Sequence, residues 1–215
     1  MIIEFVGLPG SGKSFQLQKL KSYCPEVICV STQDYYSLQQ SFSRMYILCR
    51  FLFYIVNNLK LLLLLRRYKY PAQTFRSDML LLFFLSNYKA FLKKYRNEDV
   101  VVIDQGLVQR LWYPFYRDSI TMTADHEHIT KEIIKLLYKK IPYCVVLFNI
   151  APEVAASRAV NRGGDCFADR TDYTLLLNIY SEAIKGLECI KKVAEKVVDY
   201  NENDNISAIL KKALN

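Results

Sequence analysis

Eight residues near the start of the chain have the types and the spacing that hold a phosphate chain. Residues 7–14 read GLPGSGKS and fit the pattern G-x-x-x-x-G-K-[ST] at every fixed position. The glycines allow a tight turn that aims backbone N–H groups at phosphate oxygens, and the following helix adds the positive end of its dipole. In such a loop Lys13 reaches the terminal phosphates and the Ser14 hydroxyl binds Mg²⁺. The pattern therefore predicts a site for a nucleoside triphosphate and its magnesium ion.

The surroundings of this loop favour one class of phosphate chemistry. An apolar run at residues 2–6 precedes the loop and helical spacing follows it, as a phosphate-binding loop requires. The guanine-reading sequence Asn-Lys-x-Asp is absent, which argues against a GTP switch. We expect an ATP-dependent small-molecule kinase, with an ATPase or nucleotide-binding regulator without a small acceptor as the alternative. The residues expected to hold ATP in the loop are Gly7, Pro9, Gly10, Ser11, Gly12, Lys13, Ser14 and Phe15.

The elements that must position this loop follow from alternating patterns along the chain. Strands are predicted at residues 2–6, 27–30, 100–103, 143–150 and 196–200. Helical patterns separate them, with breaks expected at Pro71 and Pro114. Short strands that alternate with helices indicate a parallel sheet covered on both faces. We therefore predict a three-layer α/β/α fold with a five-stranded parallel sheet, as a single domain over residues 1–215.

The net charge and the cysteine content indicate which kinds of partner and which cellular compartment to expect. The net charge of +8 suits an enzyme that handles anions, and no basic–aromatic stripe or reading motif points to nucleic acid. The six cysteines form no CxxC pair, which is typical of reduced, buried thiols in the cytoplasm. No signal peptide is expected, because Met1 leads directly into a strand. The expected partner is a small phosphate acceptor, and the composition leaves a homodimer open.

Beyond the loop, the chain resembles the nucleoside-monophosphate kinase superfamily, and thymidylate kinases in particular, over most of its length. Residues 80–84 and 100–106 are similar to a helix and the acidic third strand of thymidylate kinases. In that family the acid at the strand end supports Mg²⁺ through water, so the resemblance implies this role for Asp104. The alternative is that Asp104 caps the helix that follows.

A second resemblance lies in residues 158–162, which read RAVNR. They look like the lid of adenylate kinase-like enzymes, which implies that Arg158 lies over the adenine and Arg162 contacts phosphates. Side chains four apart share a helix face, and a guanidinium both stacks on rings and binds phosphate oxygens. Arg170 resembles the second lid arginine, which stabilises charge on the transferring group. The lid is expected over residues 158–172, with a solvated basic helix end as the alternative.

The acceptor side departs from the thymidylate kinase pattern. The Arg-Glu-Pro segment of those enzymes is replaced by STQDYY at residues 31–36, and Gln105 follows the strand-end acid in place of arginine. Asn87 and Tyr88 stand where those enzymes place an arginine for the acceptor phosphate. We therefore do not expect dTMP as the acceptor.

Residues 31–36 instead resemble uridine kinases, in which an aspartate follows the second strand beside aromatic residues. The resemblance implies that Asp34 is a general base that accepts the proton of an acceptor hydroxyl. An N-cap for the next helix is an equally weighted alternative for Asp34. A phosphate acceptor needs no base, so hydroxyl and phosphate acceptors both remain open, among them a nucleoside, a nucleotide or a sugar.

The helical region at residues 36–96 is expected to cover the acceptor. Within it, residues 45–70 include five consecutive leucines, at residues 61–65, followed by Arg66 and Arg67. Charged and amide residues interrupt the run, so a transmembrane span is not expected. We favour a pair of buried helices over an interfacial helix that brings the enzyme to a membrane surface or a lipid-linked sugar.

Overall fold

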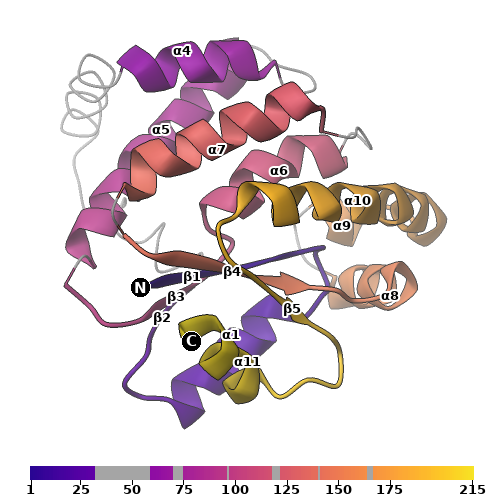
Figure 1. The fold of residues 1–215 in the computed structure, drawn as a ribbon. Helices are drawn as coiled ribbons and strands as arrows, with labels where there is room; N and C mark the ends of the chain where they lie inside the picture. Colours follow the sequence, from indigo (N-terminus) through magenta and orange to yellow (C-terminus); the bar gives the residue numbers. More distant parts are fainter. Residues whose placement is uncertain (32–58, 70–74, 96, 118–121, 140, 164–166) are drawn as a thin grey trace.

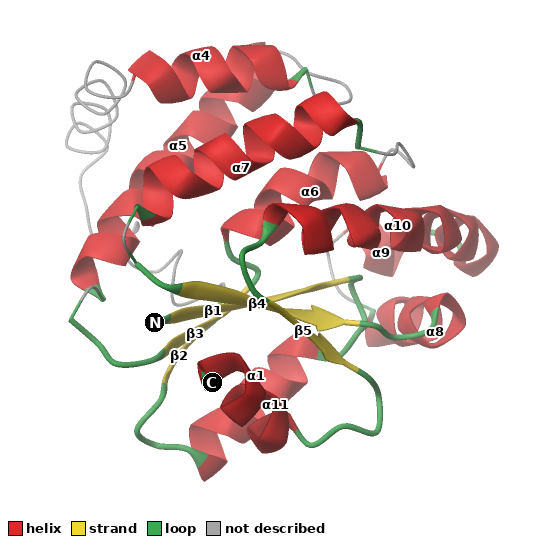
Figure 2. Cartoon of the chain, viewed as in Figure 1, coloured by secondary structure: helices red, strands yellow, loops and turns green. Residues whose placement is uncertain are grey.

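The computed structural model describes residues 1–31, 59–69, 75–95, 97–117, 122–139, 141–163 and 167–215. Parallel strands form a five-stranded sheet in the order β2-β3-β1-β4-β5. The strands are β1 (Ile2–Gly7), β2 (Ile28–Val30), β3 (Val101–Asp104), β4 (Tyr143–Phe148) and β5 (Val197–Tyr200). The sheet lies between two layers of helices (Figure 2). The predicted three-layer α/β/α fold with a five-stranded parallel sheet is confirmed.

Helices cover the sheet on both faces (Figure 1). On one face lie α1 (Lys13–Tyr23) and α11 (Ile206–Leu214). On the other lie α5 (Phe75–Lys94), α6 (Leu107–Arg117), α7 (Ala124–Tyr138) and α10 (Tyr173–Val193), with α4 (Leu59–Tyr68) packed outside against α7. In the region predicted as a lid, α8 (Pro152–Arg162) and α9 (Phe167–Arg170) lie beside each other, and α8 also packs against α10. The loop that precedes α1 therefore opens at the carboxyl edge of the sheet.

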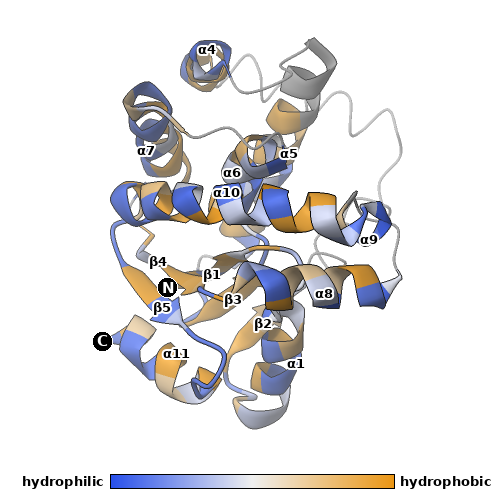
Figure 3. Cartoon of the chain, turned by 90° about the vertical axis from the view of Figure 1, so that its right-hand side faces the viewer, coloured by the Kyte–Doolittle hydropathy of each residue, from blue (hydrophilic) through white to orange (hydrophobic). Residues whose placement is uncertain are grey.

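The strands nearest the centre of the sheet are the most deeply buried. Every residue of β1, β3 and β4 is buried, as expected for parallel strands with helices over both faces. The surrounding helices carry hydrophobic and hydrophilic residues together (Figure 3), because one side of each faces the sheet or a neighbouring helix. This core holds the end of β1, and hence the start of the phosphate loop, in a fixed place.

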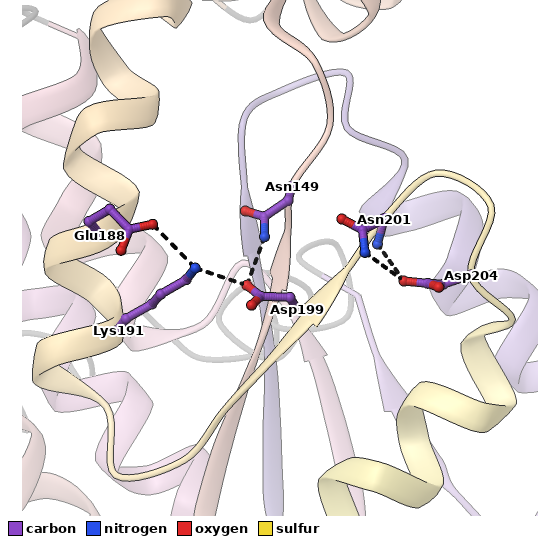
Figure 4. A network of polar contacts seen from close by, with 6 residues as sticks. All are labelled: Asn149, Glu188, Lys191, Asp199, Asn201 and Asp204. Atoms are coloured by element: carbon purple, nitrogen blue, oxygen red, sulfur yellow. Dashed lines mark hydrogen bonds and ion pairs between the residues drawn. The ribbon is translucent and has the colours of Figure 1, made fainter.

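Polar contacts attach the edge strand β5 to its neighbours (Figure 4). Asp199 Oδ1 accepts a hydrogen bond from Asn149 Nδ2 at 2.7 Å and lies 3.5 Å from Lys191 Nζ in α10. Beyond the strand, Asp204 Oδ2 accepts hydrogen bonds from Asn201, at 2.7 Å from its backbone N and 3.2 Å from its Nδ2. These contacts fix the turn that joins β5 to α11.

One predicted helix break is wrong. Helix α6 continues through Pro114, where we expected an interruption, and ends at Arg117. A proline inside a helix removes the backbone donor that would have bonded the carbonyl four residues earlier. Its neighbours Trp112 and Phe115 are buried, and this burial offsets the lost hydrogen bond.

The leucine-rich region is described only in part, because residues 45–58 and 70 lie outside the described ranges. In α4, Leu61, Leu64 and Leu65 are buried, whereas Leu59 and Leu63 are exposed. Helix α4 is therefore amphipathic, with its buried side toward α7. Across the described ranges, we find no helix with the length and apolar character needed to cross a bilayer.

Candidate active site

A cleft of about 650 Å³ opens where the phosphate loop, helix α6 and the lid helices meet. In open α/β sheets, ligands bind outside the carboxyl ends of the strands, and this cleft has that position. One wall is the phosphate loop and the start of α1. The facing residues are Gln105, Gln109, Arg110, Tyr113 and Tyr116 from the β3–α6 region, with Arg158, Arg162, Ala168 and Asp169 from the lid. The cleft thus has two walls: the phosphate loop on one side, and on the other the residues of the β3–α6 region, called the α6 wall below.

Lys13 is held inside the phosphate loop by oxygens of the loop itself. Its ammonium donates hydrogen bonds to Gly7 O at 2.9 Å, Leu8 O at 2.8 Å and Ser11 Oγ at 3.2 Å. The side chain is buried, and this burial lowers the pKa of Lys13 to about 8, although the negative charge of Asp104 opposes the shift. The loop therefore places a cation next to the point where its glycines turn.

Ser14 and Asp104 meet at the base of the cleft. Ser14 Oγ donates a hydrogen bond to Asp104 Oδ2 at 2.5 Å, and the carboxylate is only 4% exposed. Mg²⁺ prefers oxygen ligands and commonly uses one or two protein groups together with water and phosphate oxygens. Within the described ranges, no cluster of three His, Cys, Asp or Glu side chains could hold a metal ion. The paired oxygens fit a magnesium ion whose remaining ligands come from water and the nucleotide.

The start of helix α6, which Asp104 precedes, is bound by another carboxylate. The first amides of α6, from Leu107 and Val108, donate to the Glu4 carboxylate at 2.8 Å and 2.9 Å. In the same turn, the next residue, Gln109, accepts a hydrogen bond from the backbone N–H of Gly7, with an N–Oε1 distance of 2.9 Å. Helix α6 is thus attached to β1 through three consecutive residues of its first turn.

The two lid arginines share one side of α8 and line the cleft, as their spacing predicts. Arg158 forms an ion pair with Glu202 in the β5–α11 loop. Arg162 forms one with the buried carboxylate of Asp169, with a distance of 3.0 Å from Arg162 Nε to Asp169 Oδ1. Arg170 is exposed at the end of α9 and is not among the residues that line the cleft. Its proposed role stays a prediction.

A second hollow, of about 430 Å³, adjoins the phosphate loop on the α1 side. Phe15 and Arg158 border both this hollow and the main cleft. The Phe15 ring is 58% exposed, with Lys19 Nζ 4.8 Å from its centroid. Tyr200, which accepts a hydrogen bond from Gln16 Nε2 at 2.7 Å, forms another part of the wall. This hollow can accommodate a flat, partly apolar group.

Asp34, the candidate base, lies outside the described residues, so its role stays a prediction. The α6 wall, in contrast, was not predicted from the sequence. Gln109, Tyr113 and Tyr116 recur at i, i+4 and i+7 after the strand-end acid, a spacing that could have indicated one polar helix face. Arg110 also lines the cleft, with its guanidinium carbon 5.5 Å from the centroid of the Phe84 ring.

Gly10→Ala is expected to lower the free energy of unfolding by about 2–4 kcal/mol. Gly10 has a φ of +83°, and a Cβ there would lie 2.1 Å from Ala155 O in α8. Gly163→Ala is a matched control with a φ of +62°, and among the described residues no atom lies within 4 Å of its Cβ, so it should cost only about 1 kcal/mol. Chemical denaturation of both variants checks this, and equal costs would contradict the proposed clash.

No protein-family model and no curated protein sequence matches this chain. Solved structures do share its fold. A thymidylate kinase from Ehrlichia chaffeensis superimposes with a TM-score of 0.54 at 16% identity, covering 100% of this chain and 98% of that chain. A deoxyadenosine kinase from M. mycoides with bound dATP gives a TM-score of 0.51 at 12% identity, covering 99% and 96%. The predicted resemblance is confirmed at the level of the fold: the chain has the fold of the P-loop nucleoside and nucleotide kinases.

Proposed function

We propose that this chain is an ATP-dependent kinase that transfers the γ-phosphate to a small molecule. The observation that carries the proposal is the two-walled cleft. Lys13 and the Ser14–Asp104 pair form its phosphate wall, while Arg110 and Tyr113 face them from α6. An ATPase needs a place for water alone, whereas this second wall offers cationic, aromatic and amide groups to a bound acceptor.

The chain's own residues supply binding and electrostatic stabilisation. Lys13 neutralises charge on the terminal phosphates, and backbone N–H groups of the loop orient them. Magnesium, held by Ser14 and indirectly by Asp104, would neutralise charge that develops on the phosphoryl group. Arg162 already lines the cleft and would add a second cation there, after exchanging Asp169 for phosphate oxygens. Arg158 would stack on the adenine in the adjoining hollow.

The residues of the α6 wall also bear on the chemical class of the acceptor. The solved neighbours are named for a nucleotide and a nucleoside acceptor, so the fold alone does not choose between them. Arg110 and the tyrosine side chains beside it suit a ring-bearing acceptor, and Gln105 adds hydrogen-bonding groups. Together with the base role proposed for Asp34, these groups favour a hydroxyl acceptor such as a nucleoside.

A panel of acceptors tests the proposal directly. ADP release from Mg·ATP would be measured with nucleosides, nucleoside monophosphates, sugars and a lipid-linked sugar in vesicles. A kinase shows at least about tenfold stimulation by one compound class, because a bound acceptor competes with water at high effective concentration. Stimulation by the lipid-linked sugar alone would favour the membrane alternative. Equal, unstimulated ADP release throughout would contradict the kinase proposal and favour an ATPase or regulator.

Replacing the two arginines of α8 by alanine is expected to change different kinetic constants. Arg162→Ala should lower kcat more than it raises the KM for ATP, because charge on the transferring group grows toward the transition state. Arg158→Ala should mainly raise the KM for ATP through lost stacking. Steady-state kinetics at saturating acceptor checks both, with exposed Arg66→Ala in α4 as the control. A change confined to KM in both variants would refute this division of roles.

A further inference from the structure

One buried carboxylate has no part in the proposed chemistry. Glu4 lies in the middle of β1 and is fully buried. Its Oε1 accepts hydrogen bonds from Tyr88 Oη at 2.7 Å, from Leu107 N at 2.8 Å and from the Tyr138 hydroxyl, and its Oε2 accepts one from Val108 N at 2.9 Å. A single side chain therefore connects β1 with α5, α6 and α7.

Burying the Glu4 carboxylate costs desolvation free energy, and a glycine in the neighbouring loop makes room for it. Burial raises the pKa of Glu4, while the four donors and the positive end of the α6 dipole oppose that rise. Gly106 permits the close approach, because a Cβ at that position would lie 2.4 Å from Glu4 Cδ. Apolar residues would fill the same space without the desolvation cost of a buried charge. The desolvation cost of this carboxylate is offset by its four hydrogen bonds, which also connect the elements that donate them.

Two of these hydrogen bonds come from helix α6, which also contributes residues to the wall of the cleft. Glu4 accepts hydrogen bonds from the first two amides of the helix, and the next residue, Gln109, accepts one from the backbone N–H of Gly7. Arg110 and Tyr113 follow directly on the cleft wall. The register of this wall against the phosphate loop is therefore set through β1, by two contacts three residues apart on the strand.

We propose that Glu4 is a positioning residue for the α6 wall. Its carboxylate holds the first turn of α6 so that Arg110 and Tyr113 face the phosphate loop at a fixed distance and angle. The role of that wall rests on the proposed kinase function, whereas the mechanical role of Glu4 does not. Positioning matters because a misplacement of about 1 Å can cost about 10²-fold in rate.

The experiment compares Glu4→Gln and the milder Tyr138→Phe with Tyr143→Phe. Tyr143 is a matched control, because its hydroxyl is also hydrogen-bonded, but to Val193 O at 3.3 Å and Glu195 N at 3.2 Å rather than to Glu4. Its ring stacks on Tyr138 with centroids 4.6 Å apart, and phenylalanine keeps that ring, so the variant removes the hydroxyl alone. Three quantities are measured: the melting temperature, amide hydrogen exchange in the first turn of α6, and the steady-state constants. We expect faster exchange in the first turn of α6 and a kcat/KM for the acceptor lowered about 10–100-fold, with ADP affinity changed less than about threefold.

Several outcomes overturn the inference. One is unchanged α6 exchange in a folded Tyr138→Phe or Glu4→Gln protein. Another is a lower melting temperature with unchanged kcat/KM, which indicates a purely structural role. Equal effects in Tyr143→Phe would show that any lost buried hydroxyl acts alike. If the unmodified protein shows no turnover with any acceptor, the proposed function fails on its own, and the exchange data decide whether Glu4 positions α6.

Discussion

Lys13→Ala is expected to lower turnover by about 10²–10³-fold, the usual cost of removing one preorganised charge from a transferring centre. Lys13 is buried among oxygens of the phosphate loop. It is the only charged residue in the loop sequence GLPGSGKS, so no other side chain of the loop can replace its charge. ADP formation at saturating Mg·ATP and acceptor measures the loss. The melting temperature, recorded on the same sample, separates a chemical defect from an unfolded protein.

Lys21→Ala is the control for this experiment, because Lys21 is in the last turn of the same helix and is exposed. It should retain full turnover. Near-normal turnover in a folded Lys13→Ala protein would exclude phosphoryl transfer at this loop. The proposal would then have to be given up in favour of nucleotide binding without chemistry.

Asp34→Asn is expected to lower kcat by about 10²–10⁴-fold, the usual contribution of a general base. The prediction rests on a carboxylate just past the second strand, and on the absence of the arginines that thymidylate kinases use for an acceptor phosphate. Asparagine keeps a side-chain oxygen that can cap a helix, so the free energy of unfolding should change by less than about 1 kcal/mol. Turnover and chemical denaturation are measured together.

The two measurements separate the roles left open for Asp34. A large fall in kcat with unchanged stability supports a hydroxyl acceptor. An unchanged kcat would leave Asp34 as a helix cap and would make a phosphate acceptor the better proposal, since such an acceptor is already anionic. Asp34→Ala then tests the cap itself, with an expected loss of about 1 kcal/mol.

The parts of the fold that were predictable from the sequence are those set by short-range patterns. The phosphate loop needs its glycines, lysine and serine at fixed spacing, and buried parallel strands need short apolar runs. The break expected at Pro114 was wrong because burial of Trp112 and Phe115 outweighs a local preference. Packing that involves distant residues decided that helix.

The place of the α6 wall opposite the phosphate loop was not predictable, for the same reason. Glu4 meets Tyr138, 134 residues further along the chain, and Gly7 meets Gln109 across 102 residues. A glutamate inside an apolar strand is a visible signal, but its partners appear only when helices pack on the sheet. Likewise, the spacing of Arg158 and Arg162 indicated a shared face but not the acids, Glu202 and Asp169, that pair with them.

The strand order also has a consequence for how the chain is made. β1 leaves the ribosome before the other four strands of this sheet, yet it lies at the centre of the sheet and pairs with β3 and β4, at residues 101–104 and 143–148. Such long-range parallel pairing folds slowly, because loop closure precedes any stabilising contact. Until β4 has been synthesised, β1 has an open edge that other chains can pair with. A nascent chain that stalls before Tyr143 should therefore depend on chaperones, and its phosphate loop should form only late in synthesis.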